Sequence, residues 1–472
     1  MKMNKLLGPV AAAVSAAVLS LSACGGETPT ELDLIGTWEG RIDVAGISLQ
    51  VKVDFLGAGE TLQATIDIPE QSAFGLPLVG VALRGDSVRF DLPSNLGTAR
   101  FAGVLSGDNI SGSFTQGGAE GSFALSRVAV ADVAPLPYAS RDVIIEGAGF
   151  QLAGTLTLPE GAGPFPGVIL LTGSGAQNRD EAVFGFRVFG VLADHLTRSG
   201  VAVLRCDDRG VGGSTGGGVP VTDSLFAADA SLMLDYMLAD SSIASGKVGV
   251  LGHSEGSNTA FMLAAERPED VAFVVSMAGP SISGYDVLLS QIAKLSELAG
   301  LSEEQTAERL ESQRAIMDMV LGGQDLSGLD SLFRTQMMQE LQDLPPEQIE
   351  ALGEDLDDYI DSAVEQSIAE ISSPWFLRFL SRDPALDISR VACPVLALYG
   401  SLDCQVTIDA NAGPMELALT GNPDHAVIVV EGANHLFQEA VAGSVEEYAA
   451  LESHFIRGFP ETICQWIAER FQ

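Results

Sequence analysis

The hydrophobic pattern of this chain changes at about residue 141, and the change divides its 472 residues into two regions of different architecture. From residue 34 to about residue 130, apolar and polar residues alternate, as in Leu49, Val51, Val53 and Phe55. A period of two is typical of strands with one buried face, and Gly, Asp and Asn turns separate the runs. We therefore expect a small antiparallel barrel or sandwich over 34–130, followed by a linker over 131–140.

After residue 141 short apolar strands alternate with helical stretches, which indicates a mostly parallel sheet. We expect an opening hairpin and then further strands, about eight in all, over 143–146, 152–157, 168–171, 201–206, 248–251, 273–277, 395–399 and 426–430. The alternation stops over 281–389, where Ser302 and Gln305 are spaced as a capping box that begins a helix. A helical cap inserted into an α/β domain over 141–472 explains this stretch, and it would overhang the carboxyl edge of the sheet.

Net charge excludes one class of partner. The formal charge of −38 argues against a nucleic-acid ligand, because phosphate binding needs clustered Lys and Arg. No cysteines or histidines show the paired spacing of a metal site. We therefore expect no metal and no cofactor, while the oligomeric state stays open.

The N-terminus is typical of a secreted protein that is anchored by lipid. Lys2 and Lys5 precede an apolar run, and the segment that ends at Cys24 resembles the lipobox of bacterial lipoproteins. This resemblance implies a signal peptide over 1–23, lipidation of Cys24, a tether over 24–33 and a location in the cell envelope. Gly25 favours the outer membrane, with its periplasmic and surface faces both open. The other four cysteines allow three full disulfide pairings, and the pattern does not choose among them.

A sharp turn supplies the candidate nucleophile. The segment Gly252–Gly256, which reads Gly-His-Ser-Glu-Gly, follows a predicted strand and precedes an Ala-rich helical run. In a strand–turn–helix of this kind, side chains at the glycine positions would clash, and the central residue Ser254 is exposed at the turn. Serine needs a base to accept its proton, so a histidine must lie at the same edge of the sheet.

Only five histidines are available, and one has the required position. His435 follows the last predicted strand, where a loop leaves the carboxyl edge of the sheet. Asp403 likewise follows the strand over 395–399 and is the expected acid, with Asp409 as the alternative. Asp403 would accept the Nδ1 proton of His435. We interpret His253, inside the turn, as a packing residue.

The candidate oxyanion hole needs two backbone N–H groups near Ser254. One is expected from Glu255, and the other from the Gly-rich loop after the strand over 168–171, where Ser174 is the first choice and Gly175 or Ala176 remains open. We interpret Asp208 and the neighbouring Arg209 as structural residues of an adjacent loop.

These motifs together resemble a known family. Residues 141–472 are similar to bacterial α/β-hydrolase esterases related to the prolyl-oligopeptidase catalytic domain and to dienelactone and cinnamoyl-ester hydrolases. The resemblance rests on 172–180, 207–210, 252–256, 374–376, 400–403 and 434–438. One departure is Thr172, where the family usually has histidine. The resemblance implies hydrolysis of small or short-acyl carboxylic esters through an acyl-Ser254 intermediate.

Two other functions stay open at this stage. One is a serine peptidase, although the N-terminal region is too short for the β-propeller of prolyl oligopeptidases. The other is a non-catalytic surface lipoprotein whose β domain binds a ligand. In the cap, five apolar residues either line an acyl pocket or pack the cap onto the sheet, and packing is the expected role; they are Trp375, Phe376, Leu377, Phe379 and Leu380.

Overall fold

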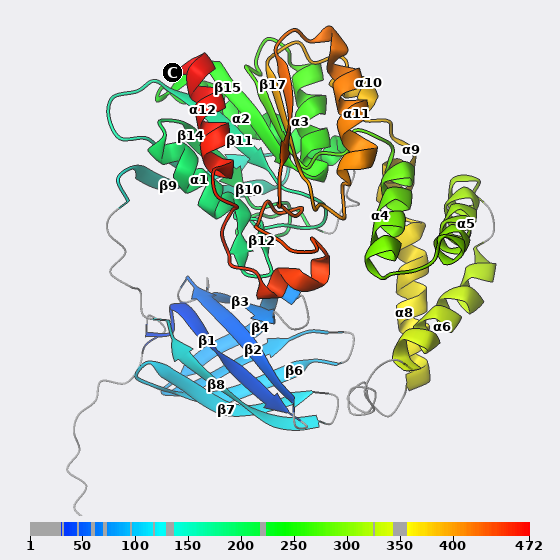
Figure 1. The fold of residues 1–472 in the computed structure, drawn as a ribbon. Helices are drawn as coiled ribbons and strands as arrows, with labels where there is room; N and C mark the ends of the chain where they lie inside the picture. The colour runs from blue at the N-terminus through cyan, green and yellow to red at the C-terminus, as the bar shows by residue number, and fades with distance from the viewer. Residues whose placement is uncertain are drawn as a thin grey trace, which may run out of the picture.

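The computed structural model describes residues 30, 33–44, 47–57, 62–68, 73–94, 97–116, 119–128, 136–217, 223–323, 326–342 and 356–472 (Figure 1). The predicted signal peptide, Cys24 and most of the predicted tether lie outside the described residues. No helix in the described part is long and apolar enough to cross a membrane.

The N-terminal region is a closed antiparallel barrel, which decides between the two predicted architectures. Its strands are β1 (Gly36–Val44), β2 (Ile47–Leu56), β3 (Gln63–Ile68), β4 (Ala73–Arg84), β5 (Ser87–Leu92), β6 (Ala99–Ser106), β7 (Asn109–Gln116) and β8 (Ala119–Arg127). Closure follows from β1, which pairs with β2 and with β8, so that Trp38 lies opposite both Val53 and Arg127. A barrel has no free sheet edge.

Aromatic side chains fill the barrel. Trp38, Phe55 and Phe90 are at most 1% exposed. The rings of Phe90 and Phe101 stack with their centroids 4.6 Å apart, and Phe123 meets Phe101 edge-on at 5.3 Å. The alternating pattern of the sequence therefore directs its apolar face into a packed core.

The C-terminal region contains an eight-stranded sheet of the predicted class. Its strands are β9 (Ala139–Glu146), β10 (Gln151–Leu158), β11 (Phe165–Leu171), β14 (Ala202–Cys206), β15 (Ile243–His253), β16 (Val274–Met277), β17 (Val395–Gly400) and β18 (His425–Val430). Their order is β18-β17-β16-β15-β11-β14-β10-β9, and only β10 runs against the others, since it pairs antiparallel with both β14 and β9. This confirms the α/β-hydrolase class of fold. Strand β9 begins at Ala139, just inside the predicted linker, because it pairs with β10 up to Leu158.

Helices cover both faces of this sheet (Figure 1). On one face lie α2 (Asp223–Ala239), α3 (Glu255–Glu266) and α11 (Ile408–Ala418), and on the other lie α1 (Val188–Arg198) and α12 (Phe459–Phe471). In β11, Ile169 belongs to the first core and Val168 to the second. Strands buried on both faces are continuously apolar, which is why these segments show no alternation.

Helices stand between β16 and β17, where the sequence predicts a cap. They are α4 (Gly284–Leu298), α5 (Glu303–Leu321), α6 (Ser327–Gln342), α8 (Leu356–Ile371), α9 (Pro374–Ser381) and α10 (Ala385–Ile388). The capping box of Ser302 and Gln305 is present at the start of α5, as predicted. Leu380 of α9 is buried against Met317 and Val320 of α5, so α9 is part of the packed cap.

Short elements complete the region. They are the two-stranded β12 (Ala182–Val183) and β13 (Phe186–Arg187), and the 3-10 helices η4 (Leu419–Gly421) and η5 (Val445–Ala450). The pair β12–β13 follows the loop after β11. The polar groups discussed below lie in the loops at the carboxyl edge of the sheet.

Candidate active site

Ser254 occupies a strained turn between β15 and α3. Its backbone has φ 51° and ψ −122°, a conformation that L-residues rarely adopt. A Cβ at Gly252 would lie 2.2 Å from the carbonyl oxygen of Gly256, and a Cβ at Gly256 would lie 2.2 Å from that of Leu171. The two glycines are therefore required by close backbone contacts, as the sequence predicts for such an elbow.

His435 lies in a tight loop just after β18. The side-chain oxygen of Asn434 accepts hydrogen bonds from the N–H groups of Leu436, at 3.0 Å, and Gln438, at 2.9 Å. These bonds fix the backbone on both sides of the imidazole. His435 is only 4% exposed, so its ring is held in a defined position.

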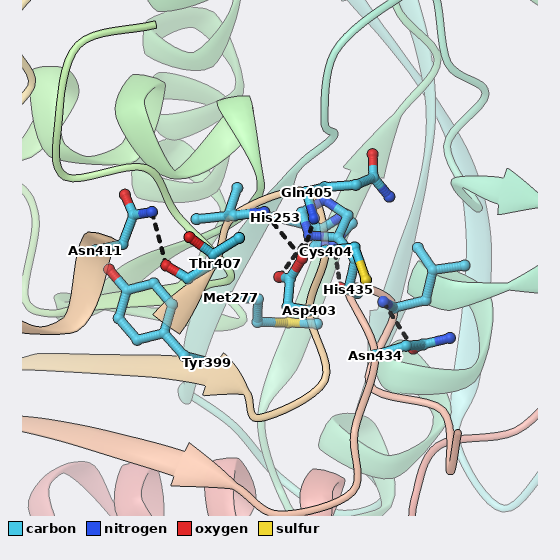
Figure 2. A network of polar contacts seen from close by, with 12 residues as sticks. His253, Met277, Tyr399, Asp403, Cys404, Gln405, Thr407, Asn411, Asn434 and His435 are labelled. Atoms are coloured by element: carbon cyan, nitrogen blue, oxygen red, sulfur yellow. Dashed lines mark hydrogen bonds and ion pairs between the residues drawn. The ribbon is translucent and has the colours of Figure 1, made fainter. Parts of the chain in front are cut away.

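Asp403 lies directly beside that ring (Figure 2). Its Oδ2 atom is 2.8 Å from Nδ1 of His435. The other carboxylate oxygen accepts N–H bonds from Gln405, at 2.7 Å, and Val406, at 2.9 Å. Because the carboxylate accepts at both oxygens, it favours the tautomer with a proton on Nδ1, which leaves Nε2 of His435 able to accept a proton.

The structure thus brings two of the three predicted catalytic residues into direct contact. Ser254 adjoins His253, whose ring centroid is 4.8 Å from that of His435. Within the described residues, the Ser254 hydroxyl makes no hydrogen bond to His435. Such catalytic hydrogen bonds are often long before substrate binds.

The loop after β11 packs against Ser254. A Cβ at Gly173 would lie 3.3 Å from Cβ of Ser254. The N–H of Gly173 donates to Oε1 of Glu181 at 2.7 Å, so that donor is already engaged. The next N–H along the loop belongs to Ser174, the predicted oxyanion donor. Glu255 is the first residue of α3, where backbone N–H groups point out of the helix end.

Two acids, Asp208 and Asp207, bind residues of the loop after β11. Asp208 accepts the hydroxyl of Thr172 at 3.2 Å and the N–H of Gln177 at 2.8 Å. Burial raises the pKa of Asp208 to about 7. Asp207 in turn binds Arg179 at 2.7 Å. Thr172, at the position where the family usually has histidine, therefore contributes a hydrogen bond to the loop's support.

A neighbouring ion pair completes this support. Nε of Arg209 donates to a carboxylate oxygen of Asp229 at 2.7 Å. The guanidinium of Arg209 also lies 3.5 Å from the centre of the Phe150 ring. These contacts are of the structural kind that the sequence analysis expects of Asp208 and Arg209.

His253 has a role that sequence reasoning missed. It is buried, its Nδ1 lies 2.8 Å from Oε1 of Glu181, and its Nε2 lies 3.0 Å from the carbonyl oxygen of His435. Both ring nitrogens thus have polar partners. Glu181 stands 72 residues from His253 in the chain, so no local pattern could have paired them.

The structure also places two other histidines, the alternative acid and the four cysteines of the C-terminal region. His425 and His454 are paired with Glu416 and Glu452, in both cases at the surface. Asp409, the alternative acid, is in the first turn of α11. Cys206, Cys393, Cys404 and Cys464 are all free thiols in the structure. Among the described residues, no cluster of three or more His, Cys, Asp or Glu side chains could hold a metal ion.

Trp375 of the cap contacts the residue that follows Ser254 in the elbow. Nε1 of Trp375, in α9, donates to Oε1 of Glu255 at 2.8 Å, and its ring stacks on Phe379 at 5.4 Å. A pocket with about 400 Å³ of empty space separates α3 from the cap. Its lining residues include Glu255, Asn258, Thr259, Met262, Ile282, Phe379 and Arg382. Trp375 therefore lies above the turn that carries Ser254, while Phe379 also packs within the cap.

Comparisons with known proteins identify the family that this chain matches. The family described as the alpha/beta hydrolase fold matches residues 166–440, more than half of the chain. Esterase EstD of Thermotoga maritima is 23% identical over 337 residues, which is 71% of this chain and 69% of that protein.

Solved structures with a similar fold include proteins of several activities. A dienelactone hydrolase from Anabaena variabilis covers 71% of this chain and 100% of its own, at 16% identity and TM-score 0.38. An esterase from Pyrococcus furiosus covers 73% of this chain and 96% of its own, at 14% identity and TM-score 0.43. A proline iminopeptidase from Mycobacterium smegmatis covers 70% of this chain and 98% of its own, at 16% identity and TM-score 0.43.

Proposed function

We propose that this chain, which belongs to the alpha/beta hydrolase family, is a serine hydrolase that cleaves carboxylic esters. The observation that carries the proposal is the 2.8 Å contact between His435 and Asp403, at the same sheet edge as the strained Ser254 turn. The 23% identity with a protein named as an esterase favours esters over peptides.

The proposed reaction uses only groups of the chain and water. His435 accepts the Ser254 proton at Nε2 while the hydroxyl oxygen attacks the ester carbonyl. Asp403 stabilises the resulting imidazolium through Nδ1. The N–H groups of Ser174 and Glu255 stabilise the oxyanion. His435 then protonates the leaving alcohol, and a water activated by the same ring releases the acid from the acyl-serine.

The proposed substrates are small esters or esters of short acyl chains. Trp375 supports this restriction, because its indole is tied to Glu255, the residue that follows the nucleophile. A bulky ring held at that place reduces the room above Ser254. Its contacts with Phe379, which belongs to the packed cap, limit how far it can move.

The direct test is hydrolysis of p-nitrophenyl esters from acetate to palmitate by the full-length protein and by Ser254→Ala. We expect turnover that is highest on short chains and that falls by at least about 1,000-fold in the variant. Ser389→Ala, which changes an exposed serine, is the matched control and should leave turnover unchanged.

Labelling with a fluorophosphonate separates the remaining functions. Labelling that is lost in Ser254→Ala, together with turnover of peptides but of no ester, would show that the protein is a serine peptidase and not an esterase. A folded wild-type protein that neither reacts with the probe nor turns over any ester or peptide would favour a non-catalytic role, with the β domain as the ligand-binding part.

We also propose that the protein is anchored in the cell envelope by lipid on Cys24. The support is the basic, apolar and lipobox-like order of residues 1–24. Metabolic labelling with a fatty acid should mark the wild type and not Cys24→Ala. Cys393→Ala, which removes an internal thiol, should retain the label.

A further inference from the structure

A buried acid–imidazole pair outside the predicted triad lies immediately beside the nucleophile. The side chains of Glu181 and His253 are 2% and 4% exposed, and Oε1 and Nδ1 are 2.8 Å apart. Removing two such groups from water is costly when they are ionised, because each charge loses its hydration. A fold that buries them next to Ser254 therefore needs compensating contacts, which are made at Oε1 of Glu181, while Oε2 is buried without a hydrogen-bond partner in the described part of the chain.

Glu181 connects this pair to the oxyanion loop. Its backbone has φ 47°, an uncommon value for a residue with a side chain. Its N–H donates to the carbonyl of Asn178 at 2.9 Å, and its own carbonyl accepts from Val188 at 3.3 Å. The carboxylate is thus aimed at the N–H of Gly173, which donates to the same Oε1 atom at 2.7 Å.

His253 connects the pair to the loop of the catalytic base. Its Nε2 lies 3.0 Å from the backbone oxygen of His435. A carbonyl oxygen only accepts, so Nε2 must carry a proton. Nδ1 faces the carboxylate of Glu181, so an ionised Glu181 requires a proton there too. The geometry therefore fits an imidazolium on His253, protonated at both nitrogens, and an ionised carboxylate on Glu181.

The surrounding charges favour this state. Burial, the largest single influence, would lower the pKa of His253, but the Glu181 carboxylate and the His435 carbonyl, together with Asp403, raise that pKa above its ordinary value. The ring of His435, at 4.8 Å between centroids, is the other titratable group against His253.

We propose that the protonated His253–Glu181 pair is a positioning device, which holds the oxyanion loop and the base loop around Ser254 and sets the alkaline limit of activity. The inference rests on the proposed hydrolase function. In one chain of contacts, Gly173 donates to Glu181, Glu181 pairs with His253, and His253 donates to the His435 carbonyl. Neither side chain needs to touch the substrate.

The pair predicts a particular pH dependence. The folded protein binds the His253 proton more tightly than the unfolded chain, because the folded pKa is raised. The resulting stabilisation is complete below the unfolded pKa, about 6.5, and is lost as pH rises through the folded value. Activity should therefore fall at alkaline pH, when His253 loses its proton and the contacts that position the two loops weaken.

Four variants test this on the full-length protein: Glu181→Gln, His253→Gln, His253→Ala and His425→Gln. Glu181→Gln keeps the shape and an acceptor for Gly173 but removes the charge. His253→Gln places an amide N–H near the Nε2 position, so it can still donate to the His435 carbonyl without titrating. His425→Gln is the matched control, because His425 also pairs with a glutamate, Glu416, at 3.1 Å but lies at the opposite end of the sheet.

We expect Glu181→Gln to lower kcat by at least about tenfold with little change in KM, since a small displacement of catalytic groups is costly. Its alkaline limb should move to lower pH. His253→Gln should recover part of kcat relative to His253→Ala and should lack that limb. His425→Gln should match the wild type. Equal loss of activity at every pH in a folded Glu181→Gln protein would overturn the positioning role.

A measurement on the wild type decides the matter if the variants do not fold. Imidazole nitrogen NMR, assigned by replacing the other four histidines one at a time, should show His253 protonated on both nitrogens at pH 7. A neutral His253 at that pH would overturn the proposal. This readout needs no substrate, so a failure of the proposed ester hydrolysis remains distinguishable from a failure of the pair.

Discussion

The barrel and the carboxyl edge of the eight-stranded sheet bury opposite kinds of side chain. In the barrel, Trp38, Phe90 and Phe101 pack in an apolar interior, and no buried polar or charged residue occurs in the described parts of 30–128. At the sheet edge, Asp403, His435, His253 and others are buried together with their hydrogen-bond partners. Apolar burial stabilises, whereas buried charge costs stability and is retained where chemistry needs it. We therefore expect substitutions in the barrel core to change mainly stability, and substitutions at the carboxyl edge of the sheet to change mainly activity.

The largest expected effect tests the chemical region. Asp403→Asn keeps the size of the side chain but leaves His435 without a carboxylate, so the ring can adopt the wrong tautomer. We expect kcat for ester hydrolysis to fall by about 10,000-fold. Asp409→Asn, which changes the alternative acid, should lose little. The reverse result from steady-state kinetics would move the acid to Asp409.

The next prediction tests the stabilising region. Phe101→Ala removes a ring from the barrel core and should lower the free energy of unfolding of the barrel by about 3–5 kcal/mol. Denaturant unfolding would measure this, with Val104→Ala, a 47% exposed residue of the same strand, as control. Ester hydrolysis by the folded variant should be unchanged. A large fall in kcat would contradict the division of roles.

The support of the oxyanion loop is expected to matter less than the triad. Asp208→Ala leaves the Thr172 hydroxyl and the Gln177 N–H without their acceptor, and we expect kcat to fall by about 10- to 100-fold. Asp208→Asn, which retains an acceptor, should lose less. Equal activity of both variants and the wild type would show that this loop does not depend on Asp208.

The same residue predicts a dependence of stability on pH. Burial raises the pKa of Asp208 to about 7, so between its unfolded and folded pKa values the folded protein binds more protons than the unfolded chain. The contribution of Asp208 to stability therefore decreases as pH rises from about 4 to about 7. Thermal unfolding of Asp208→Asn should lack this component, and an unchanged pH profile would count against it.

The smallest expected effect concerns the cap. Trp375→Phe keeps an aromatic ring but removes the N–H bond to Glu255, so we expect a change in kcat/KM of a few-fold, about 1 kcal/mol. Trp375→Ala should in addition increase the rate on longer acyl chains relative to acetate. A preference for chain length that is the same in both variants would remove Trp375 from the walls of the substrate site.

Strand prediction succeeded where the period was regular and failed where local residues interrupted it. Strand β4 was not expected, because Gly75, Pro77 and Gly80 break its alternation. In the closed barrel Pro77 nevertheless lies opposite Thr65 of β3, and pairing between neighbouring strands outweighs the local pattern. The strands of the larger sheet were easier to place, since burial on both faces makes them apolar throughout.

The candidate site likewise has parts that the sequence predicts and parts that it does not. The sequence by itself determined the turn around Ser254, because the glycines that such a turn requires are adjacent in the chain, and it placed Asp403 and His435 after successive strands of one parallel sheet. Only the tertiary structure decided what surrounds them. The contacts between Glu181 and His253, and between Glu255 and Trp375, join residues 72 and 120 positions apart. Contacts at such separations leave no periodic trace in a sequence, because they depend on how loops pack rather than on local backbone geometry.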